Sequence, residues 1–344
     1  MLNREYVDCC VVGDGELPMF EIAQGTSLDQ VSGVAVRTTT GEISLSAPTD
    51  PSLDSYPHPD WSLVDIGVYQ DSYRRRYEDE NATYGCINSQ KGCMWRFRSG
   101  GCIFCGLVRS SYRSKSPERV WEEIEHLVTR YGCNHFWELS DTICSDSEWL
   151  ERLASTRPNL PDLTFHGYAR ASEINERTAS LLQTLGFKEV FVGIESGDDE
   201  VLRRSNKGST ARTNLNATRV LCNNGIKIFS SIVLGLPGES RSSLDRTYRH
   251  VEELFSIGMS TLSVCVFTPY PGSRSFEMLK EHPLYGKRYE GADVFDWTQM
   301  ARIWAKEYCD CTFDDIEKYL EKYKAMDGCH YEDNFSYVER PYDI

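Results

Sequence analysis

The central part of the chain alternates short apolar runs, rich in β-branched and aromatic residues, with longer segments of helical periodicity. The runs of strand type cover residues 84–90, 134–140, 163–170, 189–194, 227–234 and 261–267. The helical segments cover residues 117–131, 147–155, 175–185, 211–224 and 242–257. This alternation predicts parallel strands joined by right-handed helical crossovers. Six βα units are two short of a closed eight-unit barrel, so we predict an α/β fold with a partial (β/α)6 TIM-like barrel.

Glycines support the predicted helix ends. Gly132, Gly186, Gly225 and Gly258 lie at or just past four of them. The residue after a helix often adopts a left-handed conformation, which glycine takes without steric cost. We therefore expect four of the helices to end at these positions.

The same pattern divides the chain into three parts. Residues 1–80 form an N-terminal extension of low helical content, and residues 81–268 carry the predicted barrel. Residues 269–344 form a C-terminal extension with an aromatic and acidic helical segment, Phe313–Tyr323, and three cysteines.

The charge of the chain narrows the class of partner. The 344 residues carry a net charge of -15, with a sequence pI near 5.0. A nucleic-acid partner is disfavoured, because such proteins concentrate Lys and Arg. No apolar run approaches the roughly 20 residues that span a bilayer, and the N-terminus does not resemble a signal peptide. We expect a cytoplasmic protein with no membrane contact and a small-molecule substrate.

The spacing of the cysteines points to a metal centre. The chain has 13 cysteines, and in a reducing compartment clustered cysteines indicate metal or redox chemistry rather than disulfides. Cys93, Cys102 and Cys105 lie on a glycine-rich loop after the first strand, separated by eight and then two residues. Three thiolates can hold three irons of a [4Fe–4S] cluster and leave the fourth iron open. The alternative is a zinc site with Cys86 as fourth ligand.

At these residues the sequence resembles the radical S-adenosylmethionine superfamily, whose signature is Cys-x3-Cys-x2-Cys with an aromatic residue before the last cysteine. Phe104 fills the aromatic position, whereas the gap between Cys93 and Cys102 is five residues longer than usual. The resemblance implies that S-adenosylmethionine binds the open iron and is cleaved reductively to methionine and a 5′-deoxyadenosyl radical. It also implies an electron donor of the flavodoxin or ferredoxin type.

The resemblance extends over the barrel and implies which residues surround S-adenosylmethionine. Residues 191–197 look like the family's fourth-strand segment, and residues 233–239 look like its fifth-strand turn near the adenine. The implied cofactor-binding residues are Phe104, Ser140, Asp141, Arg170, Glu195 and Leu234. Asp141 would receive the methionine amine, and Glu195 and Arg170 would contact the ribose and the carboxylate. A Glu at a strand end is also often a helix cap or a surface residue.

The N-terminal part is similar to cobalamin-dependent members of the superfamily. Residues 6–16 and 54–61 resemble the connection between the cobalamin domain and the barrel in that branch. The first 16 residues leave no room for the Rossmann-like fold of such a domain. We therefore interpret residues 1–80 as a remnant of that linker, and we predict that no cobalamin is bound.

The polar faces of the strands are expected to line the lumen of the barrel, because side chains alternate along a strand. His166 and Tyr168 share one such face, and parity places Cys265 and Glu138 with them. We predict that His166 or Glu138 acts as a base and that Cys265 donates a hydrogen atom to a substrate radical. A buried structural thiol is the alternative for Cys265.

Cysteines of the C-terminal part suggest a second centre. Cys309, Cys311 and Cys329 make four thiols together with Cys265, which is enough for an auxiliary [4Fe–4S] cluster. Such a cluster would accept an electron from a substrate radical and so favour oxidation. The alternative is a set of incidental cysteines.

The leading hypothesis is an enzyme that removes hydrogen from a carbohydrate or aminocyclitol in natural-product biosynthesis and then oxidises or epimerises that carbon. The size, charge and candidate second cluster resemble the radical S-adenosylmethionine dehydrogenases and epimerases of aminoglycoside-type pathways. A second hypothesis is a sugar decarboxylase or dehydratase, with Arg96, Arg98 and Arg109 as cations for an anionic substrate. The third is a non-catalytic iron–sulfur or zinc scaffold that only transfers electrons.

Overall fold

The computed structural model describes residues 2, 6–77, 79–107, 111–289, 295–326 and 329–331. These residues fall into two compact units, and the boundary lies after His58. The first unit has a small antiparallel sheet in the order β1 (Cys9–Val11), β2 (Val34–Arg37) and β3 (Ile43–Leu45), with one helix, α1 (Glu16–Ala23). Its helix buries no side chain completely.

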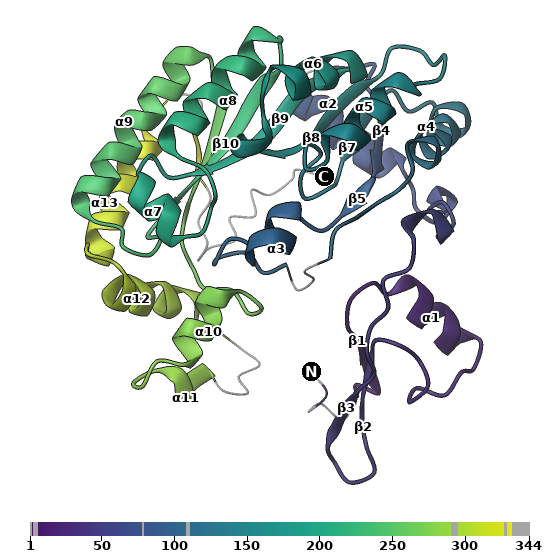
Figure 1. Cartoon of the computed structure of the whole chain (residues 1–344), viewed down its shortest axis with the longest axis horizontal. Helices are drawn as coiled ribbons and strands as arrows, with labels where there is room; N and C mark the ends of the chain where they lie inside the picture. Colours follow the sequence, from purple (N-terminus) through teal and green to yellow (C-terminus); the bar gives the residue numbers. More distant parts are fainter. Residues whose placement is uncertain are drawn as a thin grey trace. The chain divides into compact units, whose positions relative to one another are not determined.

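The second unit is built on a parallel sheet whose strands follow one another in chain order (Figure 1). The strands are β4 (Tyr84–Ile87), β7 (His135–Glu138), β8 (Thr164–Arg170), β9 (Phe187–Glu195), β10 (Lys227–Leu234), β11 (Thr261–Val266) and β12 (Cys329–Tyr331). The first six are the predicted ones, which confirms the α/β fold with a partial TIM-like barrel. The seventh, β12, was not predicted and pairs with β11, with Cys329 opposite Leu262.

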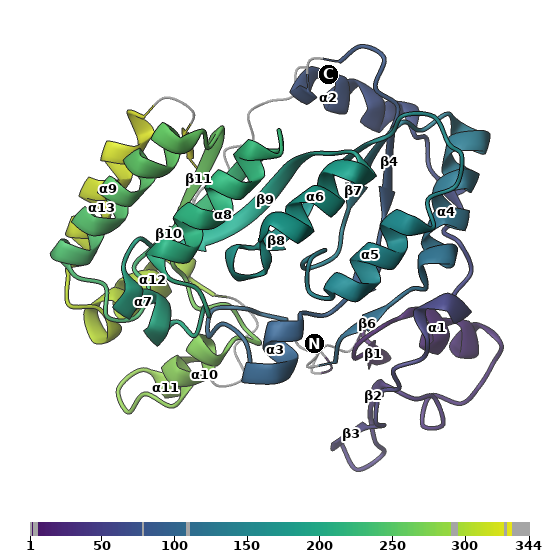
Figure 2. The same cartoon turned by 45° about the horizontal axis from the view of Figure 1, so that its top comes forward.

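Helices connect the strands and cover one side of the sheet (Figure 2). The five predicted helices are α4 (Pro117–Tyr131), α5 (Ser147–Ser155), α6 (Glu176–Leu185), α8 (Ala211–Asn223) and α9 (Arg241–Ile257), each within one residue of its expected ends. The C-terminal helices are α10 (Arg274–Lys280), α11 (Gly286–Tyr289), α12 (Trp297–Tyr308) and α13 (Phe313–Lys324). Side-chain caps fix the starts: Ser116 accepts from the Arg119 N–H, and Ser240 forms a capping box with Ser243.

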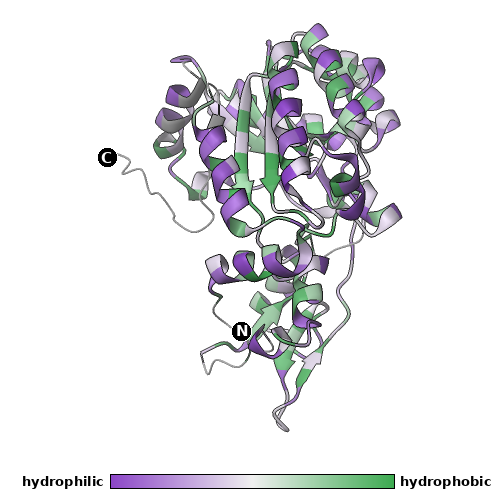
Figure 3. Cartoon of the chain, turned by 90° about the vertical axis from the view of Figure 1, so that its left-hand side faces the viewer, coloured by the Kyte–Doolittle hydropathy of each residue, from purple (hydrophilic) through white to green (hydrophobic). Residues whose placement is uncertain are grey.

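The two faces of the sheet differ in what they contact. Phe136, Phe165 and Phe187 stack against one another with ring centroids about 5.4–5.5 Å apart and belong to the core between the sheet and the helices. Figure 3 shows this arrangement as apolar strands behind helices with hydrophilic outer faces. The other face of the sheet, the inward face, carries the alternate residues of each strand, such as Trp137 and Tyr168.

The inward face is closed at the first residues of its strands by α2 (Gly67–Tyr77). The Gln70 amide brackets Tyr84, because its Nε2 donates to the Tyr84 carbonyl oxygen at 3.1 Å and its Oε1 accepts from the Tyr84 N–H at 2.6 Å. The ring of Tyr73 stacks on that of Tyr84 at 4.6 Å. This helix lies in a segment for which we expected little helix.

Among the described residues, no helix combines the length and apolarity needed to cross a bilayer.

The helix-end glycines allow a test of the fold. Gly132 and Gly186 both have positive φ, 68° and 100°, but a Cβ on Gly132 would meet nothing within 4 Å, whereas one on Gly186 would lie 2.4 Å from the Leu163 carbonyl oxygen. Gly132→Ala should cost about 1–2 kcal/mol, the strain of a left-handed alanine. Gly186→Ala should cost roughly 1 kcal/mol or more beyond that, because backbone must shift. Urea unfolding followed by circular dichroism compares the two, and equal costs would contradict the packing around Gly186.

Candidate functional site

The predicted cluster loop leaves the sheet just after β4 and is closed at its base by a short antiparallel pair, β5 (Gln90–Lys91) with β6 (Arg113–Ser114). Gly92 begins the loop with a φ of 90°, and a Cβ there would lie 2.0 Å from the Ser111 carbonyl oxygen. Its N–H donates to the Asp141 carboxylate at 3.0 Å. The start of the loop therefore requires glycine and is tied to the end of β7.

A short helix accounts for the long gap between the first two cysteines. Helix α3 (Met94–Ser99) begins directly after Cys93 and ends at Gly100, which has a φ of 81°. Gly101 also has a positive φ of 79°, so the chain reverses before Cys102. The helix takes up the residues by which this gap exceeds the usual spacing.

The three thiols of the loop lie in one electrostatic neighbourhood. Burial raises the pKa of Cys105, and negative charge on Cys102 or Cys93 adds to that increase. The Leu107 N–H points at the Cys105 sulfur at 3.5 Å. Two neighbouring thiols and one backbone N–H thus act on the Cys105 sulfur, and the assignment of these three cysteines as ligands of an iron–sulfur cluster stays a prediction.

The zinc alternative finds no support in the described part of the chain. There, no three side chains of the His, Cys, Asp and Glu type lie close enough to hold a single metal ion. Cys86 is placed in β4, where burial raises its pKa and Tyr84 and Glu123 are its neighbours. The proposed fourth zinc ligand thus interacts with the strand and with α4.

The turn after α7 (Asp199–Arg204) holds the cluster loop in place. The Trp95 indole N–H donates to the Asn206 carbonyl oxygen at 2.8 Å, and the Asn206 amide donates to the Gly101 carbonyl oxygen at 2.7 Å. The Ile103 N–H donates to the Ser205 carbonyl oxygen at 3.1 Å. A Cβ at Gly208 would lie 2.5 Å from the Trp95 ring, so only glycine leaves room for the indole. We call residues 205–208 the clamp.

Arg170, at the end of β8, reaches the cluster loop. It is buried, and its Nη1 lies 3.7 Å from the Cys102 sulfur as a hydrogen-bond donor. Its Nη2 donates to the Lys207 carbonyl oxygen, and its guanidinium lies 5.2 Å from the centre of the Trp95 ring. The expected contact to the carboxylate of S-adenosylmethionine stays a prediction, but the structure gives Arg170 a direct contact with a predicted cluster ligand.

Glu195, at the end of β9, forms a buried ion pair with Lys207. Its Oε1 accepts from the Lys207 ammonium at 2.8 Å, and its Oε2 accepts from the Ser231 hydroxyl at 3.1 Å. The side chains of Glu195 and Lys207 are 9% and 7% exposed. Gly193 leaves the space, since a Cβ there would lie 2.4 Å from the Glu195 carboxylate. The carboxylate expected to meet the ribose is therefore oriented by a lysine that no sequence motif indicated.

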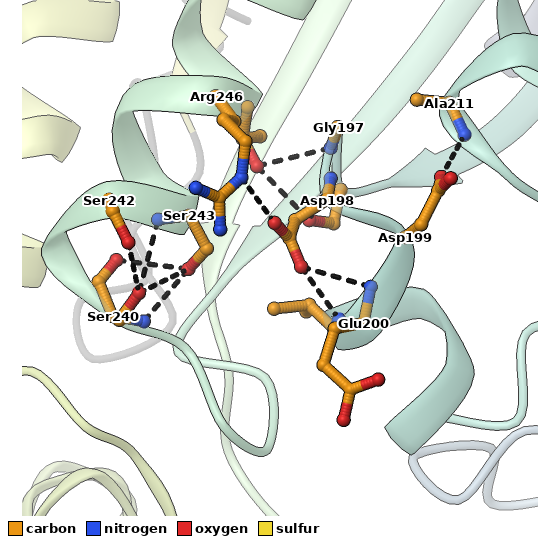
Figure 4. Close-up of polar contacts among 12 residues, drawn as sticks. Gly197, Asp198, Asp199, Glu200, Ala211, Ser240, Ser242, Ser243 and Arg246 are labelled. Atoms are coloured by element: carbon orange, nitrogen blue, oxygen red, sulfur yellow. Dashed lines mark hydrogen bonds and ion pairs between the residues drawn. The ribbon is translucent and has the colours of Figure 1, made fainter.

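The backbone after Glu195 is fixed by a polar network at the starts of α7 and α9 (Figure 4). Glu195 has a positive φ of 66°. The Thr247 hydroxyl accepts from the Gly197 N–H at 3.1 Å, and the Asp198 carboxylate caps α7 while it pairs with Arg246. These contacts hold Glu195 in a conformation that non-glycine residues seldom adopt.

The end of β7 does not have the expected orientation. Glu138 is 2% exposed and lines a small internal cavity with Trp121 and Ile124 of α4, on the helix side of the sheet. Its Oε1 accepts from the Ser89 and Ser140 hydroxyls, both at 2.6 Å, and burial raises the pKa of the carboxyl. We predicted from the alternation of side chains along the strand that Glu138 points into the lumen, and this prediction was wrong. Trp137 points inward instead, so Glu138 points toward the helices. Ser140 is fully buried in the same network, whereas Asp141 is exposed.

The inward face of the sheet carries a row of aromatic rings. Centroid distances are 5.4 Å from Trp137 to Tyr168, 5.4 Å from Tyr168 to Phe191 and 4.7 Å from Phe191 to Phe229. Each of these four residues is partly exposed. We call this row the aromatic row.

His166 and Cys265 occupy opposite parts of the inward face. His166 is 3% exposed, lies 3.6 Å from Glu189, and sits beneath the edge of the Tyr73 ring at 6.2 Å. It is thus covered by α2, near the first residues of the strands. Cys265 is partly exposed on β11 opposite Val233 of β10. The predicted base and hydrogen donor share a face as expected, but α2 covers the base.

Two further predicted cofactor contacts have different surroundings. Phe104 packs at the edge of a cluster formed by Val201, Leu236, Phe267 and Trp304, and the Lys207 ammonium lies 5.9 Å from its ring. The Leu234 side chain is fully buried in the core between sheet and helices. That side chain is consequently not accessible to a ligand.

The three described thiols of the predicted second cluster, Cys265, Cys309 and Cys311, are not gathered into one site. Cys309 donates to the Gly235 and Leu236 carbonyl oxygens at 3.4 Å, and contact with Cys311 and burial raise its pKa. Cys311 is buried in the core between sheet and helices, whereas Cys265 lies on the inward face. The Cys329 side chain is outside the described residues. The same is true of Arg109, one of the three arginines considered for an anionic substrate. The described thiols therefore form a pair at Cys309 and Cys311 rather than a cluster site.

The structure brings together residues that the motif did not indicate: Trp95, Asn206 and Lys207. The sequence offered one sign of these contacts, which is the tryptophan in the long gap between Cys93 and Cys102. A large aromatic side chain is costly to leave exposed and therefore indicates a packing partner. Nothing in the sequence showed that Asn206, 111 residues later, and Gly208 would meet that tryptophan.

Comparison with known proteins connects this geometry to a family. Residues 87–251 match the model of the radical SAM superfamily. An uncharacterized methyltransferase of Pyrococcus horikoshii is 24% identical over 79% of the chain and 58% of its own length. The anaerobic magnesium-protoporphyrin IX monomethyl ester cyclase of Rubrivivax gelatinosus is 24% identical over 80% and 49%. A putative methylthiotransferase of Methanocaldococcus jannaschii is 24% identical over 88% and 68%. The chain thus spans about half to two thirds of the length of these relatives.

Solved structures share the fold. The radical S-adenosylmethionine methyltransferase TsrM of Kitasatospora setae, with cobalamin and a [4Fe–4S] cluster bound, superimposes with a TM-score of 0.60 at 19% identity, over 80% of this chain and 54% of that one. The cobalamin-dependent enzyme OxsB with aqua-cobalamin gives 0.56 at 17% identity, over 69% and 35%.

These findings correct two predictions. The prediction of a dehydrogenase or epimerase is contradicted, because the relatives carry the names of methyltransferases, methylthiotransferases and cyclases. The prediction that cobalamin plays no part is contradicted as well, because the similar structures contain it. The prediction that no cobalamin is bound was based on the number of residues before the barrel. That number does not decide which cofactor the site receives.

The cysteine loop at the carboxyl end of β4, the strand order and the match over residues 87–251 agree, and this part of the chain is similar to the radical SAM superfamily.

Proposed function

We propose that this protein binds a [4Fe–4S] cluster through Cys93, Cys102 and Cys105 and uses it with S-adenosylmethionine in a methyl-transfer reaction. The observation that carries the proposal is the loop itself, in which α3 returns the chain so that Cys93 and Cys102 both influence the Cys105 thiol, and Arg170 lies beside Cys102. When bound, the cluster and S-adenosylmethionine supply one-electron cleavage chemistry.

The residues of the chain position these groups. Arg170 donates to the Cys102 sulfur and so stabilises negative charge on the thiolate. The Glu195–Lys207 pair presents an oriented carboxylate at the end of β9. Asp141, exposed beside Gly92, is available for the methionine amine.

Methyl transfer is proposed because the relatives named above include a methyltransferase, and because TsrM is titled a methyltransferase. Cobalamin is included as a candidate cofactor, since both solved structures contain it. The aromatic row supports a substrate with an apolar or planar face, which could pack against Tyr168 and Phe191. A carbohydrate or aminocyclitol substrate stays an untested prediction.

Iron counting tests the ligand set. After anaerobic reconstitution, the wild-type chain should hold about four irons, as one cluster requires. Cys93→Ser, Cys102→Ser and Cys105→Ser should each lose most of the iron, because three thiolates are the minimum for this site. Cys86→Ser and the double variant Cys309→Ser, Cys311→Ser are matched controls that should keep it. Roughly eight irons in the wild type, falling by half in the double variant, would restore the second cluster.

Product analysis tests the reaction. The reduced protein should show an electron spin resonance signal that changes when S-adenosylmethionine is added, because the cofactor occupies the open iron. Transfer of the methyl group leaves S-adenosylhomocysteine, which mass spectrometry detects, and its yield should rise when cobalamin is supplied. A signal indifferent to S-adenosylmethionine would instead indicate an electron-transfer protein.

Replacement of Arg170 tests its contact with the cluster. A hydrogen bond to a charged group contributes about 1.5–3 kcal/mol, so Arg170→Gln should lower the reduction potential by up to about 65–130 mV, since about 1.4 kcal/mol corresponds to about 59 mV for one electron. Arg170→Lys keeps the charge and should shift it less. Potentiometric titration at equal iron content makes the comparison, and equal potentials in all three proteins would show that Arg170 has no electronic effect.

A further inference from the structure

We propose that the outer face of α3, with Phe97 and Arg98, is the docking surface for an acidic protein that donates single electrons to the cluster. The inference rests on the proposed function, since it concerns how the same cluster is reduced. It goes further by assigning a role to the insertion between the first two cysteines.

The first observation is the distribution of charge. The chain has 52 acidic residues and a net charge of -15, yet residues 81–117 contain no Asp or Glu and six basic residues. Those are Lys91, Arg96, Arg98, Arg109, Arg113 and Lys115. An acidic chain has therefore kept its cluster loop positive, which attracts a negatively charged partner to this loop.

The second observation is the division of α3 into a fixed side and an open side. Trp95 is held by the clamp through the Asn206 carbonyl oxygen, and Arg96 donates to the Cys105 carbonyl oxygen at 3.4 Å. Phe97 is 61% exposed, and Arg98 beside it is exposed. One side of the helix thus fixes the ligands, while the other side offers an aromatic ring and a guanidinium to solvent.

The third observation is that neighbouring cations differ in how far they are neutralised. Lys115 pairs with Glu123, whereas Arg203 and Arg204 of α7 share one partner, Glu200. The Asn206 amide joins the end of α7 to the end of α3 through the Ser99 carbonyl oxygen at 3.2 Å. Within α7 the two arginines are offset by Asp199 and Glu200, so the excess of positive charge is confined to the cluster loop.

These observations favour an electron donor over a substrate. A substrate must reach the cofactor beside the inward face, whereas α3 lies on the loop between two cluster ligands and gives a donor a short covalent path to Cys93 and Cys102. An exposed aromatic ring inside a cationic surface suits a transient protein complex, in which charge guides the encounter and the ring supplies a small apolar contact. The partner's surface must be acidic.

The experiment measures the rate at which a reduced, acidic flavodoxin reduces the cluster of the reconstituted full chain, by anaerobic stopped-flow absorbance. At low ionic strength, Arg98→Glu should slow reduction roughly tenfold, and salt should slow the wild type by a similar factor. Phe97→Ser should slow it less. Arg98→Lys should keep the wild-type rate, and Arg212→Glu makes the same charge change on the exposed start of α8 as a matched control.

The outcomes separate this inference from the proposed function. Dithionite reduction followed by S-adenosylmethionine cleavage should be equal in all variants, and a failure of that step in the wild type would overturn both proposals. Normal cleavage with a flavodoxin rate that ignores salt and Arg98→Glu would overturn the docking surface alone. The docking surface would also be overturned if salt and Arg98→Glu left the flavodoxin rate unchanged while the wild type bound RNA through Arg98. RNA binding of that kind would weaken with salt and be abolished by Arg98→Glu. If Arg98→Glu fails to hold iron, the flavodoxin reduction rate of Arg98→Gln and the salt dependence of the wild-type rate test the docking surface instead.

Discussion

The clamp, residues 205–208, makes the contacts on which the rest of the site depends. Its four consecutive residues contact the cluster loop and the ends of two strands: Ser205 accepts from Ile103, Asn206 binds Trp95 and Gly101, Lys207 meets Arg170 and Glu195, and Gly208 leaves room for the Trp95 ring. The cluster loop and the clamp are 111 residues apart at the bond from Trp95 to Asn206. A single turn therefore fixes the positions of the cluster loop, the Arg170 guanidinium and the Glu195 carboxylate relative to one another.

The constraint has an energetic side. A lysine and a glutamate buried together are costly to desolvate, and such a pair persists only with good geometry and further hydrogen bonds. Ser231 supplies one such bond to Glu195, and the absence of a side chain at Gly193 supplies the space. The pair adds little net stability, but it determines where the carboxylate points. We interpret it as a means of orientation at the ends of β9 and β10.

The sequence predicted the frame of the molecule well and the interior of the site poorly, for physical reasons. Strand and helix periodicity reflects burial of one face, so β10 and the five helices between the strands were located to within a residue. The orientation of β7 failed, because Trp137 and Glu138 alternate and polarity alone does not say which faces inward. A carboxylate can be buried against helices when hydroxyl groups of Ser89 and Ser140 satisfy it. The Glu195–Lys207 contact depends on tertiary structure and leaves no periodic signal.

The α3 insertion shows why net charge is a weak guide to the partners of a site. The value of -15 describes the whole chain, but electrostatic attraction between exposed charges acts over about 8–10 Å at physiological ionic strength. Around Arg98 the sequence contributes Arg96 from the same helix, and no acidic residue within 16 positions along the chain. A partner approaching α3 therefore meets the local charge of the loop rather than the net charge of the chain.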